Sequence, residues 1–301
     1  MRCSLLPKTI VICILARNCE TALRNNIPRV ERLRKQFTSS DIIVFENDSI
    51  DDTKNILSDW AAISDNIYIK SQNFDTITLT EKTKSNPNPG SAISRIEKMA
   101  SYRNQCLNWI DHNQKSPDYV IVIDIDLLDI SVEGILTSIE DAPSDWGGLF
   151  ANGYTDLKIF DKCVHSLYHD LYAYIDKMPS VKPYLTPAEM FKNSKRLTKL
   201  IKLNNYLPVV SAFGGVGVYK YEAIKGLRYT VEANECILME AVCEHVPFNM
   251  NVVTRGYRNY ICNKMKTYYG KSNRIMILRD LLPLFLFKVI GFLFTFKWLK
   301  A

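Results

Sequence analysis

The stretch Tyr119-Val-Ile-Val-Ile-Asp-Ile-Asp-Leu127 decides the fold. Its apolar, β-branched run predicts a strand that is buried on both faces. The run stops at Asp124 and Asp126, and because side chains alternate along a strand, both carboxylates point the same way. Two converging carboxylates repel each other unless a cation lies between them, and their hard oxygen atoms suit Mg²⁺ or Mn²⁺. A solvated loop triplet is the alternative interpretation, which the preceding core strand disfavours.

Two further segments place polar residues directly after a predicted buried strand. Thr9–Asn18 is an apolar run with a polar end, and Asp41–Thr53 runs from a strand into an acidic turn. A helix over about residues 52–62 follows, with Ser49 or Asp51 as its cap. Strands that alternate with helices predict an α/β fold with a mostly parallel, doubly wound sheet. Ligands of such sheets bind beyond the carboxyl ends of the strands.

Four motifs resemble those of GT-A glycosyltransferases. Phe45–Thr53 is similar to the nucleotide-binding turn written D-D-x-S-x-D-x-T. Arg95–Asn104 resembles the R-x-x-x-x-A-x-x-R-N helix of mannosyltransferase-like families, which include fungal Golgi and capsule α-mannosyltransferases and bacterial and viral relatives. Ser211–Tyr219 and Cys243–Phe248 are similar to the acceptor-side loop and the C-terminal motif of that group. The order of the four motifs, over roughly residues 8–262, makes the resemblance more specific than any one of them.

The resemblance implies a Rossmann-like GT-A fold and a metal-dependent glycosyltransferase. The expected cofactor is Mn²⁺ or Mg²⁺. The expected partners are a GDP- or UDP-sugar donor, with mannose as the first candidate sugar, and a glycan or lipid-linked acceptor. Retention of configuration at the sugar is expected by analogy with the most similar families.

Both basic and acidic residues are expected to contact the nucleotide-sugar donor. Arg95 and Arg103 lie eight positions apart on one helix face, and forked guanidinium groups suit diphosphate oxygens. Arg17, after the first strand, is a comparable candidate; a surface salt bridge is the alternative for the helix arginines. Glu46 and Asp48 are expected to accept hydrogen bonds from the base or ribose, unless they only form a solvated turn. The other expected substrate contacts are Ala16, Ser49, Asn104, Asp124, Gly214 and Gly215, the glycines because they allow close backbone approach.

Glu244 and His245 stand where many GT-A enzymes carry a Glu-Asp pair, whose second acid is the general base of inverting members. The histidine departs from that pattern. It can act as a base near neutral pH, complete a metal site with Asp124 and Asp126, or simply pack. We expect His245 to be a metal ligand. The residues expected to take part in catalysis are Asp126, Glu244 and His245.

Two other classes of function remain open. A nucleotidyltransferase also uses paired aspartates, but it usually has a glycine-rich loop after the first strand, and Ala16–Glu20 contains no glycine. A non-catalytic glycan- or membrane-binding protein on a GT-A scaffold is the other alternative. The retained aspartates and arginines argue against it.

Composition is that of an ordinary globular protein. The chain has 301 residues, 47% hydrophobic and 23% charged, which fits one large α/β domain. The resemblance implies that this is a single GT-A domain over residues 1–270, with nucleotide and acceptor halves at about 8–130 and 131–265. The net charge of +6 is spread along the chain, and no nucleic-acid-binding motif accompanies it, so no nucleic acid is expected as a partner. Eight scattered cysteines without a Cys-x-x-Cys pair favour buried thiols in a reducing, cytoplasmic compartment.

The C-terminal segment, residues 271–301, carries a membrane signal. Leu281–Leu299 is about long enough to span a bilayer, but Lys288 near its middle and Pro283 disfavour a spanning helix. Flanking basic residues favour a segment that lies on anionic lipid, which predicts peripheral membrane contact. A C-terminal helix packed on the domain is the equal alternative.

Overall fold

The computed structural model describes residues 6–75, 89–159, 162–176, 187–234 and 240–272. The predicted lipid-facing segment, Leu281–Leu299, lies outside them, so lipid contact and cytoplasmic location stay predictions. Within the described ranges no helix is both long and apolar enough to cross a membrane.

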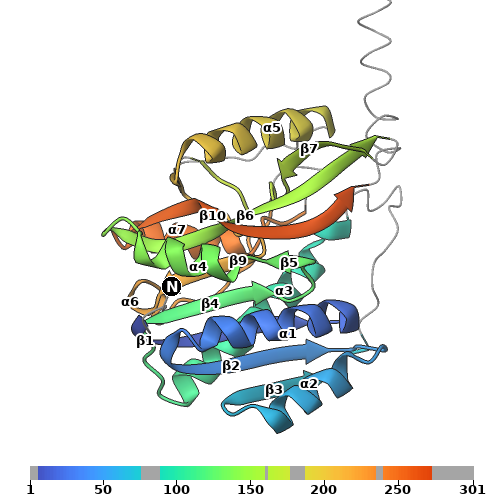
Figure 1. Cartoon of the computed structure of the whole chain (residues 1–301), viewed down its shortest axis with the longest axis vertical. Helices are drawn as coiled ribbons and strands as arrows, with labels where there is room; N and C mark the ends of the chain where they lie inside the picture. Colours follow the sequence, from blue (N-terminus) through green and yellow to red (C-terminus); the bar gives the residue numbers. More distant parts are fainter. Residues whose placement is uncertain (1–5, 76–88, 160–161, 177–186, 235–239, 273–301) are drawn as a thin grey trace, which may run out of the picture.

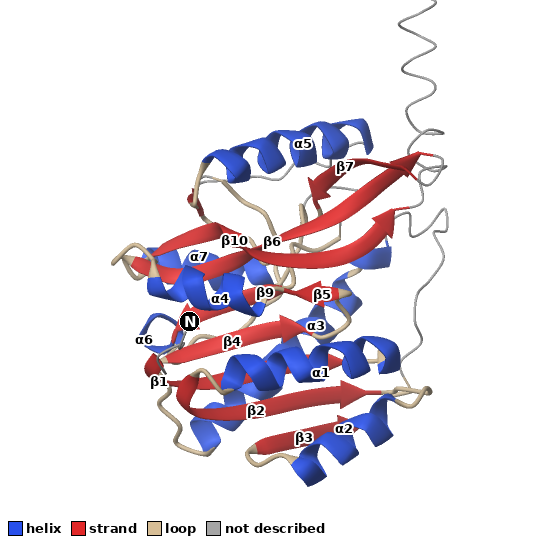
Figure 2. Cartoon of the chain, in the orientation of Figure 1, coloured by secondary structure: helices blue, strands red, loops and turns tan. Residues whose placement is uncertain are grey.

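The first half of the chain forms a parallel sheet in the strand order β3-β2-β1-β4 (Figures 1 and 2). Its central strand pairs on both sides, Ile12 lying opposite Ile42 and Ile121. The expected alternation of strands and helices is confirmed by β1 (Leu6–Ala16), α1 (Glu20–Arg34), β2 (Phe37–Asn47), α2 (Thr53–Ile63), β3 (Ile67–Gln72), α3 (Ile93–His112) and β4 (Tyr119–Asp124), with a short 3₁₀ turn η1 (Pro89–Ser91) before α3.

The second half extends the sheet with mostly antiparallel pairs. It continues from β4 in the order β9-β6-β10-β5, and only the β6–β10 pair is parallel. The strands are β5 (Asp129–Ile130), β6 (Trp146–Ile159), β7 (Lys162–Tyr168), β8 (Tyr206–Val209), β9 (Val216–Lys220) and β10 (Arg258–Ser272), and the helices are α4 (Val132–Glu140), α5 (Pro187–Leu203), α6 (Tyr221–Ile224) and α7 (His245–Thr254). Because β10 runs to Ser272, the sheet extends past the domain end predicted at residue 270.

Strand alternation divides the interior into two cores. In β1, Val11 and Cys13 face a core shared with α3 and α7, whereas Ile12 and Ile14 face a core shared with α1, α2 and α4. Covering both faces of the sheet explains why these strands are continuous apolar runs rather than alternating ones. The doubly wound α/β architecture predicted from the sequence is therefore present.

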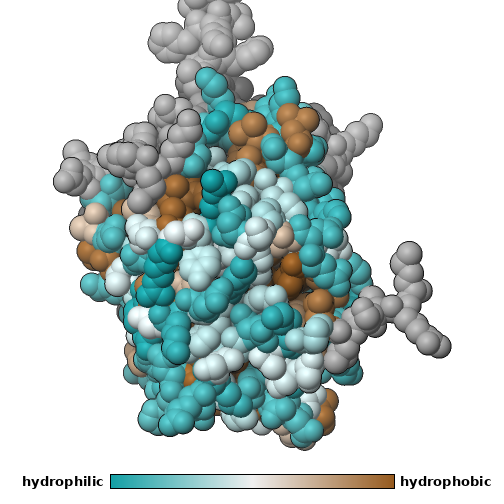
Figure 3. All heavy atoms as spheres, turned by 90° about the vertical axis from the view of Figure 1, so that its left-hand side faces the viewer, coloured by the Kyte–Doolittle hydropathy of each residue, from teal (hydrophilic) through white to brown (hydrophobic). Residues whose placement is uncertain are grey.

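The carboxyl ends of the parallel strands meet at one edge of the sheet. The arrowheads of β2 and β4 point to the right in Figure 1, so this edge lies on that side. Figure 3 shows the opposite side of the molecule, where hydrophobic atoms form small separate groups among hydrophilic ones. The carboxyl edge is where the polar residues singled out in the sequence gather.

Candidate active site

Asp124 and Asp126 lie at the end of β4, as predicted. Asp124 is the last residue of the strand and is 27% exposed, and Asp126 follows on the exposed turn. Burial raises the pKa of Asp124 to about 6, with a further rise from Asp126 and an opposing effect of Arg103. Partial desolvation also raises the pKa of Asp126, although its side chain reaches solvent. The two carboxyl groups are therefore less readily ionised than free ones, and Arg103 opposes this effect at both.

Arg103 is the positive group that faces this pair from α3. Its Nη2 donates to Asp124 Oδ1 at 3.1 Å, and its Nε donates to Glu244 Oε1 at 3.0 Å. The guanidinium is 4% exposed and lies over the Phe213 ring at 4.9 Å. Burial alone would lower its pKa, but the two carboxylates raise the pKa well above the usual range. Arg103 is thus a buried bridge between the aspartate pair and Glu244, rather than a free group at the surface.

The turn that carries Asp126 is also held from α1. Asn26 is fully buried, and its Nδ2 donates to the carbonyls of Ile125 at 3.0 Å and Leu127 at 2.6 Å. These two carbonyls flank Asp126, so the side chain of Asn26 sets the backbone course around it. Nothing in the sequence distinguishes this asparagine from others on the helix, and the sequence analysis missed it.

Gly214 and Gly215 lie directly beside Asp124. The Asp124 amide donates to the Gly215 carbonyl at 2.9 Å, and the Gly214 amide donates to Asp170 Oδ2 at 3.0 Å. Both glycines have positive φ, +66° and +88°, and a Cβ on Gly214 would meet the Ala151 carbonyl oxygen at 2.2 Å. Only glycine therefore fits where the loop passes the aspartate pair.

Asp170 and Tyr269 are two further site residues that the sequence did not indicate. The Tyr269 ring stacks on His169 at 4.2 Å. Burial raises the pKa of the Tyr269 hydroxyl well above its ordinary value, and Asp170 and Asp124 add to the rise. Both residues lie beside the two glycines: Asp170 accepts from the Gly214 amide, and the Tyr269 hydroxyl lies 3.0 Å from where a Cβ on Gly215 would be.

The acidic turn after β2 binds the loop after β1. The amide of Asn18 donates to Ser49 Oγ at 3.0 Å, and the amide of Cys19 donates to Thr53 Oγ1 at 2.9 Å. In return, the Ile50 amide donates to Asn18 Oδ1 at 2.8 Å. The serine and threonine of the turn motif thus fix the neighbouring loop, which carries Arg17 at the carboxyl edge.

The side chains of Glu46 and Asp48 accept hydrogen bonds in and beside the same turn. Glu46 is fully buried and accepts from the Ser49 amide at 2.8 Å and from the Ser71 hydroxyl. Asp48 is 8% exposed and accepts from the Phe74 amide at 2.6 Å. Phe74, beside this turn, is 48% exposed and packs against Tyr102 at a centroid distance of 5.8 Å.

His245 is packed inside the protein. It is 2% exposed, its ring stacks on Phe213 at 3.9 Å, and Tyr229 meets it edge-on at 5.4 Å. Its Nε2 is 3.9 Å from Glu244 Oε1. Burial, with a contribution from Arg103, lowers its pKa well below the ordinary value, so the imidazole is neutral.

The expected three-ligand metal site is not assembled. Among the residues that the structure describes, no group of three or more His, Cys, Asp or Glu side chains is placed to hold a metal ion. His245 lies flat against Phe213 instead of joining Asp124 and Asp126, because an aromatic pocket has formed around its ring. Asp124 and Asp126 therefore form a pair at the end of β4 without His245, and metal binding by this pair stays a prediction.

The other residues predicted to bind substrate differ in how far they are exposed to solvent. Arg95 is exposed, and its Nη1 donates to the Gly90 carbonyl at 3.1 Å. Asn104 pairs with the backbone of Tyr229, donating to its carbonyl at 2.9 Å and accepting from its amide at 2.8 Å. Ala16 is the buried last residue of β1, and the half-buried Arg17 follows it. Asn104 is thus bonded to the backbone of Tyr229, whereas Arg95 is exposed and Arg17 is half-buried, and contact of the three with a substrate stays a prediction.

Residues 9–244 match the family model described as cryptococcal mannosyltransferase 1. The chain belongs to this family. It is a family of the mannosyltransferase-like glycosyltransferases that the four motifs resemble, so the predicted family is confirmed. No curated protein matches the chain in sequence.

Solved structures with a related chain course include three glycosyltransferases. The mannosyltransferase PcManGT from Pyrobaculum calidifontis, in complex with GDP-Man and Mn²⁺, is 10% identical with a TM-score of 0.45 over 87% of this chain and 57% of that one. S. aureus TarS, in complex with UDP-GlcNAc, is 15% identical, with a TM-score of 0.43 over 88% and 59%. Glucosyl-3-phosphoglycerate synthase from Mycobacterium tuberculosis, with UDP, is 13% identical, with a TM-score of 0.39 over 88% and 72%. This family member thus spans less than two thirds of the first two proteins.

Replacing Asn26 tests the clamp on the aspartate turn. Asn26→Ala leaves the carbonyls of Ile125 and Leu127 buried without their donor, so we expect a loss of roughly 1–3 kcal/mol in unfolding free energy. Urea denaturation measures it. Asn55→Ala, which removes an exposed amide on α2 that binds only Asp52, is the matched control and should change little. Equal losses in the two variants would contradict the clamp.

Arg103 and Arg95 should differ sharply when each is replaced by alanine. Arg103→Ala leaves Asp124 and Glu244 without their buried partner, and breaking such a pair costs about 3–5 kcal/mol of stability. Arg95→Ala at the exposed position should cost less than about 0.5 kcal/mol. Denaturation curves of the two variants give the comparison. A stable Arg103→Ala protein would show that the bridge is unimportant for folding.

His245→Ala distinguishes packing from metal binding. Removing a stacked, buried ring should destabilise the protein by about 2–4 kcal/mol. The metal concentration for half-maximal hydrolysis of the donor should stay unchanged, because the imidazole is not placed with the two aspartates. A higher metal requirement in the variant would restore the ligand role.

Proposed function

We propose that the protein transfers a mannosyl residue from a nucleotide-activated donor to a saccharide acceptor, with Mg²⁺ or Mn²⁺ bound by Asp124 and Asp126. The family match supports mannose as the sugar. The observation that carries the proposal is the carboxylate pair at the end of β4, with Asp124 tied to Arg103 and Asp126 facing solvent.

The donor set fits a hard divalent cation. Two carboxylates leave most of the coordination shell for diphosphate and water oxygens, which is the usual arrangement for Mg²⁺ in nucleotide sites. When bound, the cation supplies positive charge where the departing diphosphate gains negative charge. The raised pKa values of both carboxyl groups agree with a site that lacks this charge in the protein alone.

The protein's own residues then position the reactants. Arg103 and Asn26 hold Asp124 and the turn around Asp126 in a fixed place, which avoids reorganisation during the reaction. Phe74 offers its exposed ring, beside Asp48, as a surface for the nucleobase. Gly214 and Gly215 keep the opposite wall free of side chains, so that a sugar ring can lie next to the aspartates. GDP- and UDP-linked donors both fit this description, and direct comparison of the two decides between them.

We also propose that configuration at the sugar is retained. In inverting relatives the general base stands at the position of His245, but this ring is buried against Phe213 and does not reach an acceptor hydroxyl. The anomeric signal of the first product in proton NMR tests the stereochemistry. An inverted product would remove this part of the proposal.

Asp126→Ala is the sharpest test of the metal site. Because the side chain is exposed, its loss should leave the fold intact, while Mn²⁺-dependent binding of GDP-mannose or its UDP-linked counterpart should fall at least roughly tenfold, about 1.4 kcal/mol. Titration calorimetry, with and without chelator, measures how the substitution and the removal of metal each change donor binding. Asp129→Ala removes an exposed carboxylate three positions further on, whose partner is Arg29, and is the matched control. Donor binding that ignores both chelator and Asp126→Ala would sink the metal proposal.

A further inference from the structure

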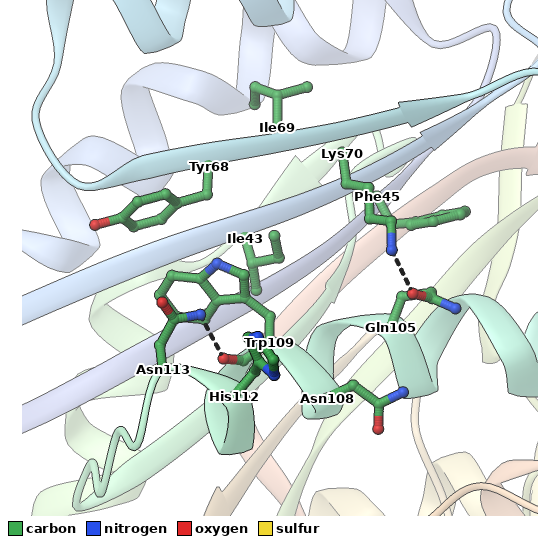
Figure 4. A pocket seen from close by; sticks show the side chains of 10 residues that line it. All are labelled: Ile43, Phe45, Tyr68, Ile69, Lys70, Gln105, Asn108, Trp109, His112 and Asn113. Atoms are coloured by element: carbon green, nitrogen blue, oxygen red, sulfur yellow. Dashed lines mark hydrogen bonds between the residues drawn. The ribbon is translucent and has the colours of Figure 1, made fainter.

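A cavity of about 320 Å³ lies away from the aspartate pair, between the edge strand β3 and the second half of α3 (Figure 4). Helix α3 packs mainly on β1 and β2, and it meets β3 through the contacts of Trp109 with Tyr68 and of Gln105 with Lys70. The side of β3 that faces α3 is therefore only partly covered. Alternate residues of a strand share a face, and Tyr68 and Lys70 point from β3 into this space.

The floor of the cavity is aromatic. Tyr68, 39% exposed, lies against Trp109 with ring centroids 4.6 Å apart and planes tilted by 43°. Phe45 and Ile43 from β2 close the floor. Since Tyr68 and Trp109 already touch each other at an angle, a flat nucleobase finds no parallel slot between them. A ligand with an apolar face can instead lie on the exposed side of the pair.

Besides Lys70 and His112, the polar side chains that line the cavity are three carboxamides, each held at one end only. Gln105 accepts from Lys70 Nζ at 2.6 Å, and Asn108 accepts from Arg228 Nε at 3.0 Å. Asn113 donates to the Trp109 carbonyl at 2.8 Å. Each carboxamide is thus fixed, with its opposite end unused by any residue that the structure describes. The amide nitrogens of Gln105 and Asn108 are left to donate, and the oxygen of Asn113 is left to accept.

The charge of the lining excludes several ligands. No aspartate or glutamate lines the cavity, so it does not suit a cation. Lys70 is already paired with Gln105, and no arginine lines the site, so a phosphate has no forked partner. The ligand that matches is neutral, with one apolar face and several hydroxyl groups.

We propose that this cavity is a saccharide-binding subsite that holds one sugar ring of a glycan, separate from the donor site. The C–H face of the ring lies on Tyr68 and Trp109, and its hydroxyl groups bond to Gln105, Asn108 and Asn113. The volume is at the lower end of ligand sites, as a single ring requires. The proposal rests on the proposed function only for the choice of a mannose-containing probe.

Tryptophan fluorescence provides the test. Trp60 and Trp146 are buried at 2% and 4% exposure, whereas Trp109 is half-buried in the cavity. In the chain with the fourth tryptophan, Trp298, replaced by phenylalanine, a change in emission reports on occupancy of the cavity. Linear mannotriose, added to the full chain, should change the emission with a Kd on the order of 1 mM, about −4 kcal/mol. Saturation-transfer NMR on mannotriose confirms direct contact with the aromatic protons.

Variants separate this subsite from the donor site. Tyr68→Ala and Gln105→Ala should each weaken mannotriose binding at least roughly tenfold, about 1.4 kcal/mol. Ile63→Ala, an exposed apolar residue on α2, is the control and should leave binding unchanged. Asp126→Ala should bind mannotriose normally, so a failure of the metal proposal does not affect this result.

Three outcomes would overturn the subsite. The first is no emission change or saturation transfer with mannotriose up to about 100 mM, a hundred times the expected Kd. The second is binding that Tyr68→Ala and Gln105→Ala leave intact, which would place the sugar elsewhere. The third is guanosine competing at the Trp109 signal with higher affinity, which would make the cavity a nucleoside site.

Discussion

The buried guanidinium of Arg103 is the constraint on which the site depends. It lies between Asp124 on β4 and Glu244 before α7, so one charge joins three elements that are far apart in the chain. A charge that is 4% exposed is tolerated only when its partners are in place. The two carboxylates therefore fix the relative positions of α3, β4 and the turn that precedes α7. The position of Asp124 follows from the same contact that permits burial of the charge.

The motif residues of the acidic turn act in a similar way. Ser49 and Thr53 accept hydrogen bonds from the backbone after β1, while Glu46 accepts from the Ser49 amide and from Ser71. A loop held by reciprocal bonds of this kind loses less entropy when a substrate arrives. The motif is therefore explained largely by preorganisation, and the ring of Phe74 beside it is 48% exposed.

The sequence predicted local structure well, but it did not predict contacts between residues that are far apart in the chain. Continuous apolar runs predicted the buried strands, and residues 52–62 predicted α2 to within one position of Thr53–Ile63, because both patterns follow from neighbouring residues. The sequence also predicted that polar residues after different strands would come together, because the carboxyl ends of parallel strands lie on the same side of a sheet. In contrast, the pairing of Arg103 with Glu244, 141 positions away, has no local signature. The packing of His245 against Phe213 and the clamp of Asn26 on the aspartate turn were missed for the same reason.

Helix α3 shows how one element serves several purposes through its different faces. Arg103 points to the aspartate pair, whereas Gln105 and Trp109 point to the open side of β3. Six residues at a rise of 1.5 Å separate Arg103 and Trp109 by about 9 Å along the helix axis. Because Arg103 is fixed at both carboxylates, the helix cannot shift to cover β3 without breaking a buried ion pair. The cavity beside β3 is therefore a consequence of the same bridge that organises the site.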